Sequence, residues 1–304
     1  MVDDGSTDRS GKICDTYAER YVFIHVHHNT NHGLLFTRRF AMERASGEYI
    51  INLDSDDSLV LNALEVINQK INQYHCDCVI YGLNRYYADK NLQPYTSSFT
   101  DDQLIINKRE LCKEVFSTQK YNSLCRKAVK RSIIGKIDFS NYYYIAHGED
   151  LLQSVEIYRY AESFLITPEN LYNYRITPYS MIHTKRLKDF DPNFTVQTTI
   201  LHFLEEQSLF DDSDYKAYRS QCVIAFIQTL QGIADIAATN KEKIQLLSRI
   251  DEADYYRTFL RNSNIDRTAI GLKIVFFDLY NRRHFKVLIA LERLYTMISG
   301  GREK

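Results

Sequence analysis

Short apolar runs alternate with amphipathic segments over the first 90 residues of the chain. An apolar run bounded by turn residues is typical of a buried strand, whereas apolar positions three and four residues apart are typical of a helix. The pattern predicts strands over 21–27, 49–53 and 77–81, and helices over 9–20, 34–45 and 59–74. This order of elements predicts an α/β fold with a Rossmann-like, mostly parallel, doubly wound sheet.

The pattern changes twice further along the chain. It turns polar over residues 85–103, where Pro94 predicts a loop or a hairpin. From about Pro192 onward the period is helical, with apolar residues at i, i+3 and i+4. This second pattern predicts helices over 194–207, 214–238, 241–249 and 269–299. We therefore predict an α/β domain over 1–190 and a helical C-terminal domain over 191–304.

The composition is that of an ordinary globular protein. Of 304 residues, 44% are hydrophobic and 25% are charged, and the net charge of −1 gives no reason to expect a nucleic-acid partner. No apolar run approaches the roughly 18 residues that a membrane-spanning helix needs. Six cysteines without the spacing of a disulfide framework, and no secretory leader, favour a cytoplasmic protein that is at most attached to a membrane surface.

Three carboxylates follow the apolar run Tyr49–Leu53 within four positions: Asp54, Asp56 and Asp57. Because open α/β sheets bind their ligands at the carboxyl ends of the strands, we expect these acids at that edge. Their mutual repulsion implies a neutralising cation, and oxygen ligands favour Mg²⁺ or Mn²⁺. A divalent ion held in this way commonly carries a phosphate-bearing substrate.

The same acids have three other interpretations. They can cap the helix predicted over 59–74, whatever their chemistry. A calcium loop that starts at Asp54 needs glycine at its sixth position, where Leu59 stands, so that interpretation is excluded. A phosphohydrolase with Asp54 as nucleophile needs a further acidic motif of the type Gly-Asp-x-x-x-Asp, which the sequence lacks, and it is the least supported hypothesis.

Polar residues also gather at the start of the chain. The segment Val2–Asp8 is typical of a strand end, a tight glycine turn and a helix cap. Capping alone would explain its composition. A carboxylate beside such a turn, Asp3 or Asp4, is equally well placed to accept hydrogen bonds from a base or a ribose.

Two later motifs carry charge next to apolar segments. Within Ala146–Leu152, Glu149 and Asp150 follow a glycine and open a helical stretch. They either complement the helix dipole or supply a general base toward a hydroxyl. Within Leu171–Ser180, Arg175 follows tyrosines, and it either binds phosphate bidentately or is the exposed arginine of an ordinary aromatic strand.

The order of these motifs is more specific than any one of them. They read Val-Asp-Asp-Gly-Ser-Thr-Asp, Asn-x-Gly, an arginine before Ala-Ser-Gly-Glu-Tyr-Ile, Leu-Asp-Ser-Asp-Asp, Gly-Glu-Asp and Tyr-x-Tyr-Arg. Over residues 2 to 183 this order resembles the family 2 glycosyltransferases, which have the nucleotide-sugar-binding fold known as GT-A. Leu-x-Tyr-Arg after Glu-Asp is similar to bacterial enzymes that build capsular, lipopolysaccharide-type or wall polysaccharides.

The resemblance implies a donor-binding role for five residues in the first part of the chain. Asp4, with Asp3 beside it, would contact the nucleoside of the sugar donor, which is uridine in most members. Asn31 and Gly33 match the turn after the next strand. Arg38 matches the arginine that approaches the diphosphate.

The resemblance also implies where the chemistry takes place. Asp54 and Asp56 match the Asp-x-Asp motif, with Asp56 as the more direct ligand of Mn²⁺ or Mg²⁺. Asp150 matches the catalytic base, with Glu149 beside it in the substrate site, and Arg175 lies in the donor-closing segment. The implied activity is metal-dependent, inverting transfer of a sugar from a UDP-sugar to a hydroxyl of a surface polysaccharide or a lipid-linked oligosaccharide.

Two departures from the family pattern bear on this expectation. Arg39 stands where the family usually has asparagine, so donor selection could differ. Family members also carry roughly forty residues before Val-Asp-Asp, including a central strand whose loss would leave unpaired sheet edges. We therefore expect either a start upstream of Met1 or a fragment. The alternative hypothesis is a truncated, inactive relative that acts as a binding module.

The last part of the chain is basic and amphipathic. Residues 267–304 hold eight Lys or Arg against three acids, with apolar residues interleaved. These helices either pack on the catalytic domain or dock on anionic lipid at the inner face of the membrane. Lipid-linked acceptors would make the second arrangement useful.

Overall fold

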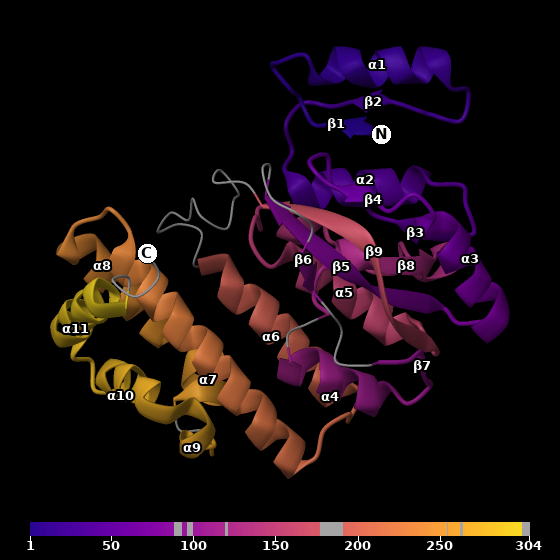
Figure 1. Cartoon of the computed structure of the whole chain (residues 1–304). Helices are drawn as coiled ribbons and strands as arrows, with labels where there is room; N and C mark the ends of the chain where they lie inside the picture. Colours follow the sequence, from indigo (N-terminus) through magenta and orange to yellow (C-terminus); the bar gives the residue numbers. More distant parts are fainter. Residues whose placement is uncertain are drawn as a thin grey trace. The chain divides into compact units, whose positions relative to one another are not determined.

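The computed structural model describes residues 1–87, 93–95, 100–118, 121–176, 191–253, 255–261 and 264–299. The chain forms two compact units, whose elements are traced in Figure 1. The first unit comprises Met1–Lys108 and Lys120–Ile176, and the second comprises Arg109–Gln119 and Thr177–Lys304. The domain boundary predicted at residue 190 lies outside the described residues and stays a prediction.

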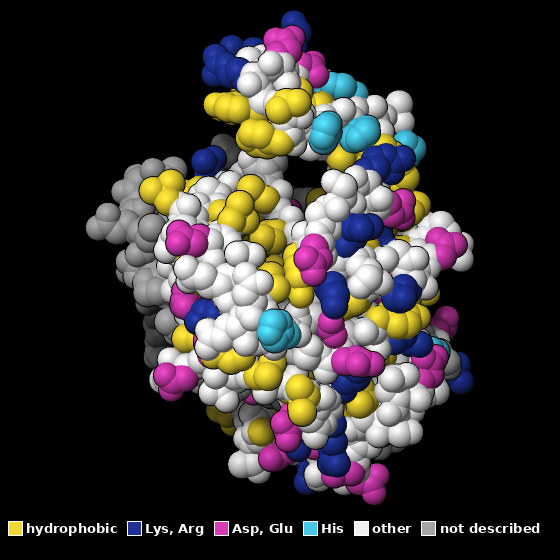
Figure 2. All heavy atoms as spheres, turned by 90° about the vertical axis from the view of Figure 1, so that its right-hand side faces the viewer, with side chains coloured by type: hydrophobic (Ala, Val, Ile, Leu, Met, Phe, Trp, Pro, Cys, Tyr) yellow, Lys and Arg dark blue, Asp and Glu magenta, His cyan; other side chains and the backbone are white. Residues whose placement is uncertain are grey.

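The first unit begins with a two-stranded parallel sheet and one helix. Strand β1 (Val2–Asp3) pairs with β2 (His27–His28), and α1 (Ser10–Arg20) connects them. Among the described strands, β1 pairs with β2 alone, and this sheet is separate from the larger one. Figure 2 shows histidine side chains gathered here above a hollow, where a cavity of about 350 Å³ is lined by residues that include Val2 and Ala41.

The strand predicted over 21–27 is wrong for most of its length, because only its last residue belongs to β2. The backbone instead turns after α1, and Ile24 N donates to Tyr21 O at 2.9 Å. The apolar alternation therefore does not mark a buried strand here. Val22 and Phe23 are 90% and 75% exposed.

A seven-stranded mixed sheet forms the larger part of the first unit, in the order β3-β8-β5-β9-β4 with β6 and β7 at its margins. Its strands are β3 (Tyr49–Ile51), β4 (Ser58–Leu59), β5 (Cys78–Tyr87), β6 (Gln93–Tyr95), β7 (Gln103–Ile105), β8 (Lys127–Lys130) and β9 (Phe164–Ile176). The longest pairing, β5 with β9, is parallel as predicted. The pairs β3–β8, β5–β8, β4–β9, β5–β6 and β7–β9 are antiparallel. The hairpin expected over 85–103 is formed by β5 and β6.

Three helices and three short 3-10 turns accompany this sheet. They are α2 (Leu34–Arg44), α3 (Ala63–Tyr74), α5 (Glu149–Tyr160), η1 (Leu124–Arg126), η2 (Arg131–Ile133) and η3 (Ser140–Tyr142). The helices predicted over 34–45 and 59–74 are confirmed, but α3 begins four residues late. The reason is that Ser58 and Leu59 are taken into the sheet, opposite Asn173 and Tyr172 of β9. The α/β class of this unit is thus confirmed.

The core of this unit lies between α3 and the strands β5, β8 and β9. Ile67, Val79, Ala128 and Leu165 are buried there in one apolar cluster. Ile67 and Val79 lie in a predicted helix and a predicted strand, whereas Ala128 and Leu165 lie in β8 and β9, where the sequence analysis predicted no element. Their burial supplies most of the stabilisation of such a layered fold.

The second unit is helical, as the period after residue 192 predicted. Its elements are α4 (Lys108–Thr118), α6 (Asp191–Glu206), α7 (Asp212–Asp235), α8 (Asn240–Glu252), the π-helical turn η6 (Tyr255–Leu260), α9 (Arg267–Ile270), the 3-10 turn η7 (Gly271–Lys273), α10 (Ile274–Asn281) and α11 (Phe285–Ser299). Capping boxes begin α7 at Asp211 and α8 at Thr239. Sequence and structure therefore agree on where these helices start.

The single helix predicted over 269–299 is wrong, because the chain breaks at Arg283. This residue has a φ of 57°, in the left-handed region, between α10 and α11. Its Nε donates to the buried carboxylate of Asp251 at 2.8 Å. The ion pair with α8 holds the break in place, and nothing in the apolar spacing of this segment indicates it.

The sequence predicted no helix long enough to span a membrane. Within the described ranges, no helix combines the length and the apolar character that crossing a bilayer requires. All six cysteines lie in described segments and are free thiols. Five are buried, and Cys14 on α1 is partly exposed.

Candidate active site

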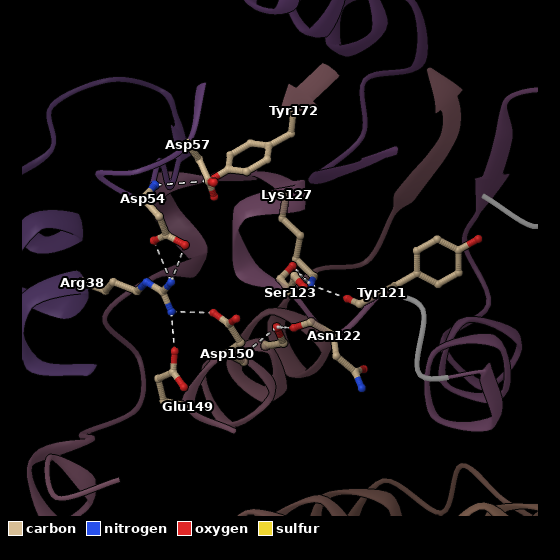
Figure 3. Close-up of polar contacts among 11 residues, drawn as sticks. Arg38, Asp54, Asp57, Tyr121, Asn122, Ser123, Lys127, Glu149, Asp150 and Tyr172 are labelled. Atoms are coloured by element: carbon tan, nitrogen blue, oxygen red, sulfur yellow. Dashed lines mark hydrogen bonds and ion pairs between the residues drawn. The ribbon is translucent and has the colours of Figure 1, made fainter. Parts of the chain in front are cut away.

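Arg38 lies at the centre of a cluster of three carboxylates, drawn in Figure 3. Its Nη1 donates to Glu149 Oε1 at 2.5 Å and to Asp150 Oδ1 at 2.6 Å. Its Nη2 donates to both oxygens of Asp54, at 2.7 and 2.9 Å. The Arg38 side chain is 9% exposed, so these charge-assisted hydrogen bonds are largely shielded from water. The structure therefore brings together four predicted site residues from three separate stretches of sequence.

Arg38 lies within α2, and the three carboxylates lie at or just beyond the ends of other elements. Asp54 follows β3 in a turn that is closed by Asp57 N, which donates to Asp54 O at 3.1 Å. Glu149 and Asp150 form the first turn of α5, where the helix dipole favours negative charge. The preceding Gly148 has a φ of 83°, a left-handed conformation that glycine adopts without strain.

Burial tunes the charges of this cluster. It raises the pKa of Glu149 to about 7, and the charge of Asp150 adds to the rise while Arg38 opposes it. Burial also raises the pKa of Asp150, and Arg38 lowers it in part. The pKa of Arg38 is lowered by burial, but the three carboxylates together outweigh this and raise it. The site therefore pairs a fixed cation with carboxylates whose raised pKa suits proton transfer near neutral pH.

Asp57, the third acid after β3, is bound differently from Asp54. Its Oδ2 accepts a hydrogen bond from Tyr172 Oη at 2.7 Å, and its Oδ1 accepts one from Arg175 N at 2.8 Å. Tyr172 Oη also accepts from Asp54 N at 3.2 Å. Burial raises the pKa of Asp57, and the hydrogen bonds from Arg175 and Tyr172 oppose the rise. Asp57 thus links the loop of residues 54–57, the acid loop, to β9.

Arg175 and Asp56 lie at the open side of this loop. The Arg175 guanidinium is exposed, and its Nε donates to Tyr86 Oη at 3.3 Å. The hydrogen bond with Tyr86 raises the pKa of Arg175, and the charges of Asp56 and Asp57 raise it further. Asp56 is exposed as well. A cation and an anion are therefore presented together next to the buried cluster.

Asp3 and Asp4 form a second group on the β1–β2 side of the unit. Asp4 Oδ1 accepts from His32 N at 3.0 Å, and Asp4 Oδ2 accepts from Gly33 N at 2.8 Å. Asp3 Oδ2 pairs with His28 Nδ1 at 2.9 Å, and hydrogen bonds from Ser6 and His28 lower the pKa of Asp3. Both acids are therefore bound to the protein and hold the turn that leads into α2.

Two turns next to Asp4 contain a glycine at positive φ: the turn that leads into α2 and the turn that follows β1. Gly33 precedes α2 with a φ of 91°. Gly5 has a φ of 79°, and a Cβ there would lie 2.8 Å from Asn31 N. The close approach of the two backbones aligns Asn31 and Gly33 with Asp4. Sequence reasoning grouped these residues correctly in space, while their contact with a ligand stays a prediction.

Arg39, which departs from the family pattern, points away from the acid cluster. Its Nη1 donates to Glu156 Oε2 at 2.6 Å, and both side chains are buried. Glu156 Oε1 accepts from Lys136 N and Ile137 N at 2.6 and 2.8 Å. Arg39 therefore ties α2 to α5 and has a structural partner within its own unit.

Lys127 is a buried cation that the sequence analysis did not single out. Its Nζ donates to Tyr121 O at 2.5 Å and to Ser123 O at 2.8 Å, and burial lowers the pKa of Lys127 to about 8. The loop that it holds leads into Leu124, whose backbone N–H lowers the pKa of Asp150. The signal that could have identified Lys127 is a lysine directly before the apolar pair of the strand Lys127–Lys130.

Tyr172 was also missed, although it lies in the Tyr-x-Tyr-Arg motif. Its side chain is fully buried. The alternation of β9 turns it inward, and a buried tyrosine hydroxyl usually has a partner. That signal could have identified Tyr172, but not the acid it binds, because Asp57 is more than a hundred positions away in sequence.

The acids of this edge suit a hard divalent cation in chemical type. Carboxylate oxygens are the ligands of Mg²⁺ and Mn²⁺. Among the described residues, no three His, Cys, Asp or Glu side chains lie close enough together to hold an ion by themselves. Asp54 and Asp56 therefore fit a cation only in the manner of sites that use one or two carboxylates and complete the shell with substrate phosphates.

Comparison with known proteins relates the first part of the chain to a family. Residues 1–137 match Glycosyl transferase family 2, a stretch that includes Asp4, Arg38 and Asp54. Glycosyltransferase GlyG of Streptococcus pneumoniae is 29% identical over 61% of this chain and 63% of its own length. An uncharacterized glycosyltransferase of Bacillus subtilis, EpsJ, is 27% identical over 60% of this chain and 53% of its own length. The chain thus spans between half and two thirds of these relatives.

A solved structure shares the fold. Staphylococcus aureus TarS 1–349, crystallised with UDP-GlcNAc, superposes with a TM-score of 0.67 at 16% identity, over 97% of this chain and 81% of that one. Such a likeness establishes architecture rather than activity. The chain therefore has the GT-A fold, with a helical C-terminal region. Residues 1–137, somewhat less than half of the chain, match glycosyl transferase family 2, and the relatives described above are glycosyltransferases by name.

Proposed function

We propose that the protein is a metal-dependent, inverting glycosyltransferase that moves a sugar from a UDP-sugar to an acceptor hydroxyl. The observation that carries this proposal is the contact of Arg38 with Asp54 and Asp150, at 2.7 and 2.6 Å. It brings together the three side chains to which this proposal assigns diphosphate binding, metal binding and general-base catalysis. TarS, which shares the fold, was crystallised with UDP-GlcNAc and with UDP.

Asp150 is the proposed general base. Burial raises the pKa of its carboxyl, which strengthens it as an acceptor of the proton from the attacking hydroxyl. Its carboxylate is 32% exposed, so an acceptor can reach it. Attack on the anomeric carbon from the face opposite the diphosphate inverts the configuration at that carbon. Arg38, whose Nη atoms donate to the three carboxylates in this structure, would then form hydrogen bonds with the leaving diphosphate.

Asp54 and Asp56 would hold Mn²⁺ or Mg²⁺ together with the donor. When bound, the ion would neutralise charge on the departing diphosphate. Arg38 and Arg175 add positive charge from the protein itself. For coordination of the ion itself, this proposal uses the two acids.

The nucleoside would bind beside Asp3 and Asp4. Asp4 uses one lone pair of each oxygen for the N–H groups of His32 and Gly33. A carboxylate has about four acceptor positions, so it retains capacity for a uracil N–H. Asn31, held against Gly5, would line the same pocket.

The proposed acceptor is a growing surface polysaccharide or a lipid-linked oligosaccharide, reached at the cytoplasmic face of the membrane. Helix α11 supports a peripheral contact. One of its stripes is apolar and exposed at i, i+4 and i+7: Val287, Leu291 and Leu294. Lys286 and Arg293 are exposed beside it, while the acid of this helix, Glu292, is buried. Cosedimentation with phosphatidylglycerol vesicles, but not with phosphatidylcholine vesicles, would support this contact, and Leu291→Glu should abolish it.

The test of the activity is a screen of UDP-sugars with Mn²⁺, in which UDP release and UDP binding are measured separately. We expect UDP binding in both wild type and Asp150→Asn, and turnover that is about 10²–10⁴-fold lower in Asp150→Asn than in wild type. If wild type binds no UDP, the protein is an inactive relative. If Asp150→Asn turns over normally, the base is wrongly assigned.

A further inference from the structure

Asp57 is the acid of the 54–57 loop that faces the protein rather than the open edge of the sheet. Both of its oxygens accept hydrogen bonds from β9, from Tyr172 Oη at 2.7 Å and from Arg175 N at 2.8 Å. Asp54 and Asp56 are engaged otherwise, Asp54 by Arg38 and Asp56 at the exposed side of the loop. The three acids therefore divide into two that face the site and one that faces β9.

The hydroxyl of Tyr172 joins the loop at two points. It donates to Asp57 and accepts from Asp54 N at 3.2 Å, so one buried atom holds both ends of the acid loop (Figure 3). Pairing of Ser58 with Asn173 continues the attachment along β4 and β9. The loop can thus shift only together with this part of β9.

The same stretch of β9 presents Arg175 to solvent. Its backbone N–H is held by Asp57, while its guanidinium lies 5.9 Å from the ring centroid of Tyr86 and is fully exposed to water. Arg175 is paired with Tyr86 in the β5–β9 ladder, and the Asp57 carboxylate connects its backbone to the loop that carries Asp54 and Asp56. Arginine binds phosphate through a rigid fork, so the position of its backbone decides where that fork can reach.

We propose that Asp57 and Tyr172 are positioning residues that lock the acid loop to the Arg175 segment, so that the cation held by Asp54 and Asp56 and the diphosphate held by Arg175 bind cooperatively. This inference rests on the proposed function for its ligands. Its structural part, a mechanical link between the loop and β9, does not depend on them. Asp57 on this view is not a metal ligand, although it belongs to the same run of acids.

The link is tested first without any ligand, by amide hydrogen exchange. Asp54 N–H and Arg175 N–H are the two amides held directly, and mass spectrometry follows them in peptides that begin at least two residues earlier, such as 51–59 and 171–176. Tyr172→Phe removes one oxygen atom, and we expect faster exchange in both segments. Tyr49→Phe is the matched control, since it removes a hydroxyl that donates to Cys76 O at 2.7 Å, outside the loop.

The cooperativity is tested by calorimetry of UDP binding with and without Mn²⁺. The ratio of the two affinities measures the coupling, which is typically 5- to 150-fold between linked sites. We expect Tyr172→Phe and Asp57→Asn to reduce this ratio about fivefold or more, with little change in UDP affinity without Mn²⁺. Tyr49→Phe should keep the wild-type ratio. Arg175→Ala should lose the coupling, and the double variant Arg175→Ala with Tyr172→Phe should show no further reduction in the ratio of the two affinities.

Each outcome decides the matter. Faster exchange in both segments together with reduced coupling supports the proposal, and Asp57→Asn supplies a second variant if Tyr172→Phe folds poorly. Exchange that rises in one segment alone, additive losses in the double variant, or wild-type coupling in both single variants would overturn it. A wild type that couples Mn²⁺ to UDP yet transfers no sugar would count against the proposed function alone.

Discussion

Arg38 and Asp150 are 112 positions apart in sequence, and their side chains meet at 2.6 Å in the first unit. Burial raises the pKa of the Asp150 carboxyl, and the Arg38 guanidinium lowers it in part. On the proposed function, a bound diphosphate would compete with Asp150 for Arg38, and donor binding would be connected to the basicity of Asp150 through this one side chain. Four predictions concern the contacts of this cluster and of the elements that hold it.

Removing Arg38 should destabilise the fold as well as abolish transfer. Arg38→Ala leaves three carboxylates without their cation, and breaking a buried ion pair costs about 3–5 kcal/mol. Urea unfolding measures this loss. Arg44→Ala on the same helix is the control, since Arg44 is exposed and donates only to Phe40 O, and its effect should stay within about 0.5 kcal/mol. Equal losses in the two variants would show that the ion cluster contributes nothing.

Stability should fall as pH rises through the range in which Glu149 titrates. Its folded pKa, about 7, lies above the ordinary value of 4.5, so the folded state binds more protons than the unfolded state between these values. The free energy of unfolding therefore decreases with rising pH in this window. Glu149→Gln removes the titration, and its thermal midpoint should fall less than that of wild type between pH 4.5 and 7.5.

The control for this pH effect is Glu65→Gln, an exposed substitution on α3 that should keep the wild-type slope. The comparison uses the difference between two pH values within each variant. Any general effect of the substitution on stability therefore cancels. A wild-type slope in Glu149→Gln would mean that Glu149 is ionised in the fold throughout this range.

Replacing Lys127 should loosen the loop beside the base. Lys127→Met leaves the carbonyls of Tyr121 and Ser123 without their donor, at a cost of about 1–3 kcal/mol. Since this loop leads to Leu124, whose backbone N–H lowers the pKa of Asp150, turnover should fall more than UDP affinity. Urea unfolding and the split between kcat and KM are the measurements.

The matched control is Lys130→Met on the same strand, because Lys130 is 41% exposed and lies 3.6 Å from Asp77. It should change the free energy of unfolding by less than about 0.5 kcal/mol. If Lys127→Met behaves like Lys130→Met, the buried ammonium has no special part in the loop.

Asp56→Ala should remove the effect of Mn²⁺ on UDP binding without unfolding the protein. Asp56 is exposed, so its loss leaves the core unchanged. Calorimetry with and without Mn²⁺ measures the difference. Asp212→Ala, at an exposed position in the first turn of α7, should retain the wild-type response. Retention of the manganese response in Asp56→Ala would remove this residue from the proposed cation site.

The sequence predicted the elements that carry a strong period and the motifs at their ends. The helix over 34–45, the strand end before Asp54 and the first turn at Glu149 were placed well, because local patterning determines them. The family order then implied that Arg38, Asp54 and Asp150 share a site, and they do meet. Periodicity alone does not encode that meeting, because it depends on how distant elements pack.

The failures have a common physical origin in tertiary contacts. The segment 21–27 alternates like a strand, yet most of it lies exposed in a turn. The break at Arg283 depends on Asp251, which local spacing does not reveal. Tyr172 looked like one aromatic among several until its hydroxyl was found between Asp54 and Asp57. Each of these depends on a partner far away in the chain.

The distribution of thiols has a practical consequence. Burial raises the pKa of Cys76, Cys78, Cys125 and Cys222, so these sulfurs react slowly as nucleophiles, whereas Cys14 on α1 is partly open to solvent. A maleimide fluorophore should consequently modify the native polypeptide at α1. Emission from that dye would report motions of the amino-terminal helix in real time, without any engineered attachment point.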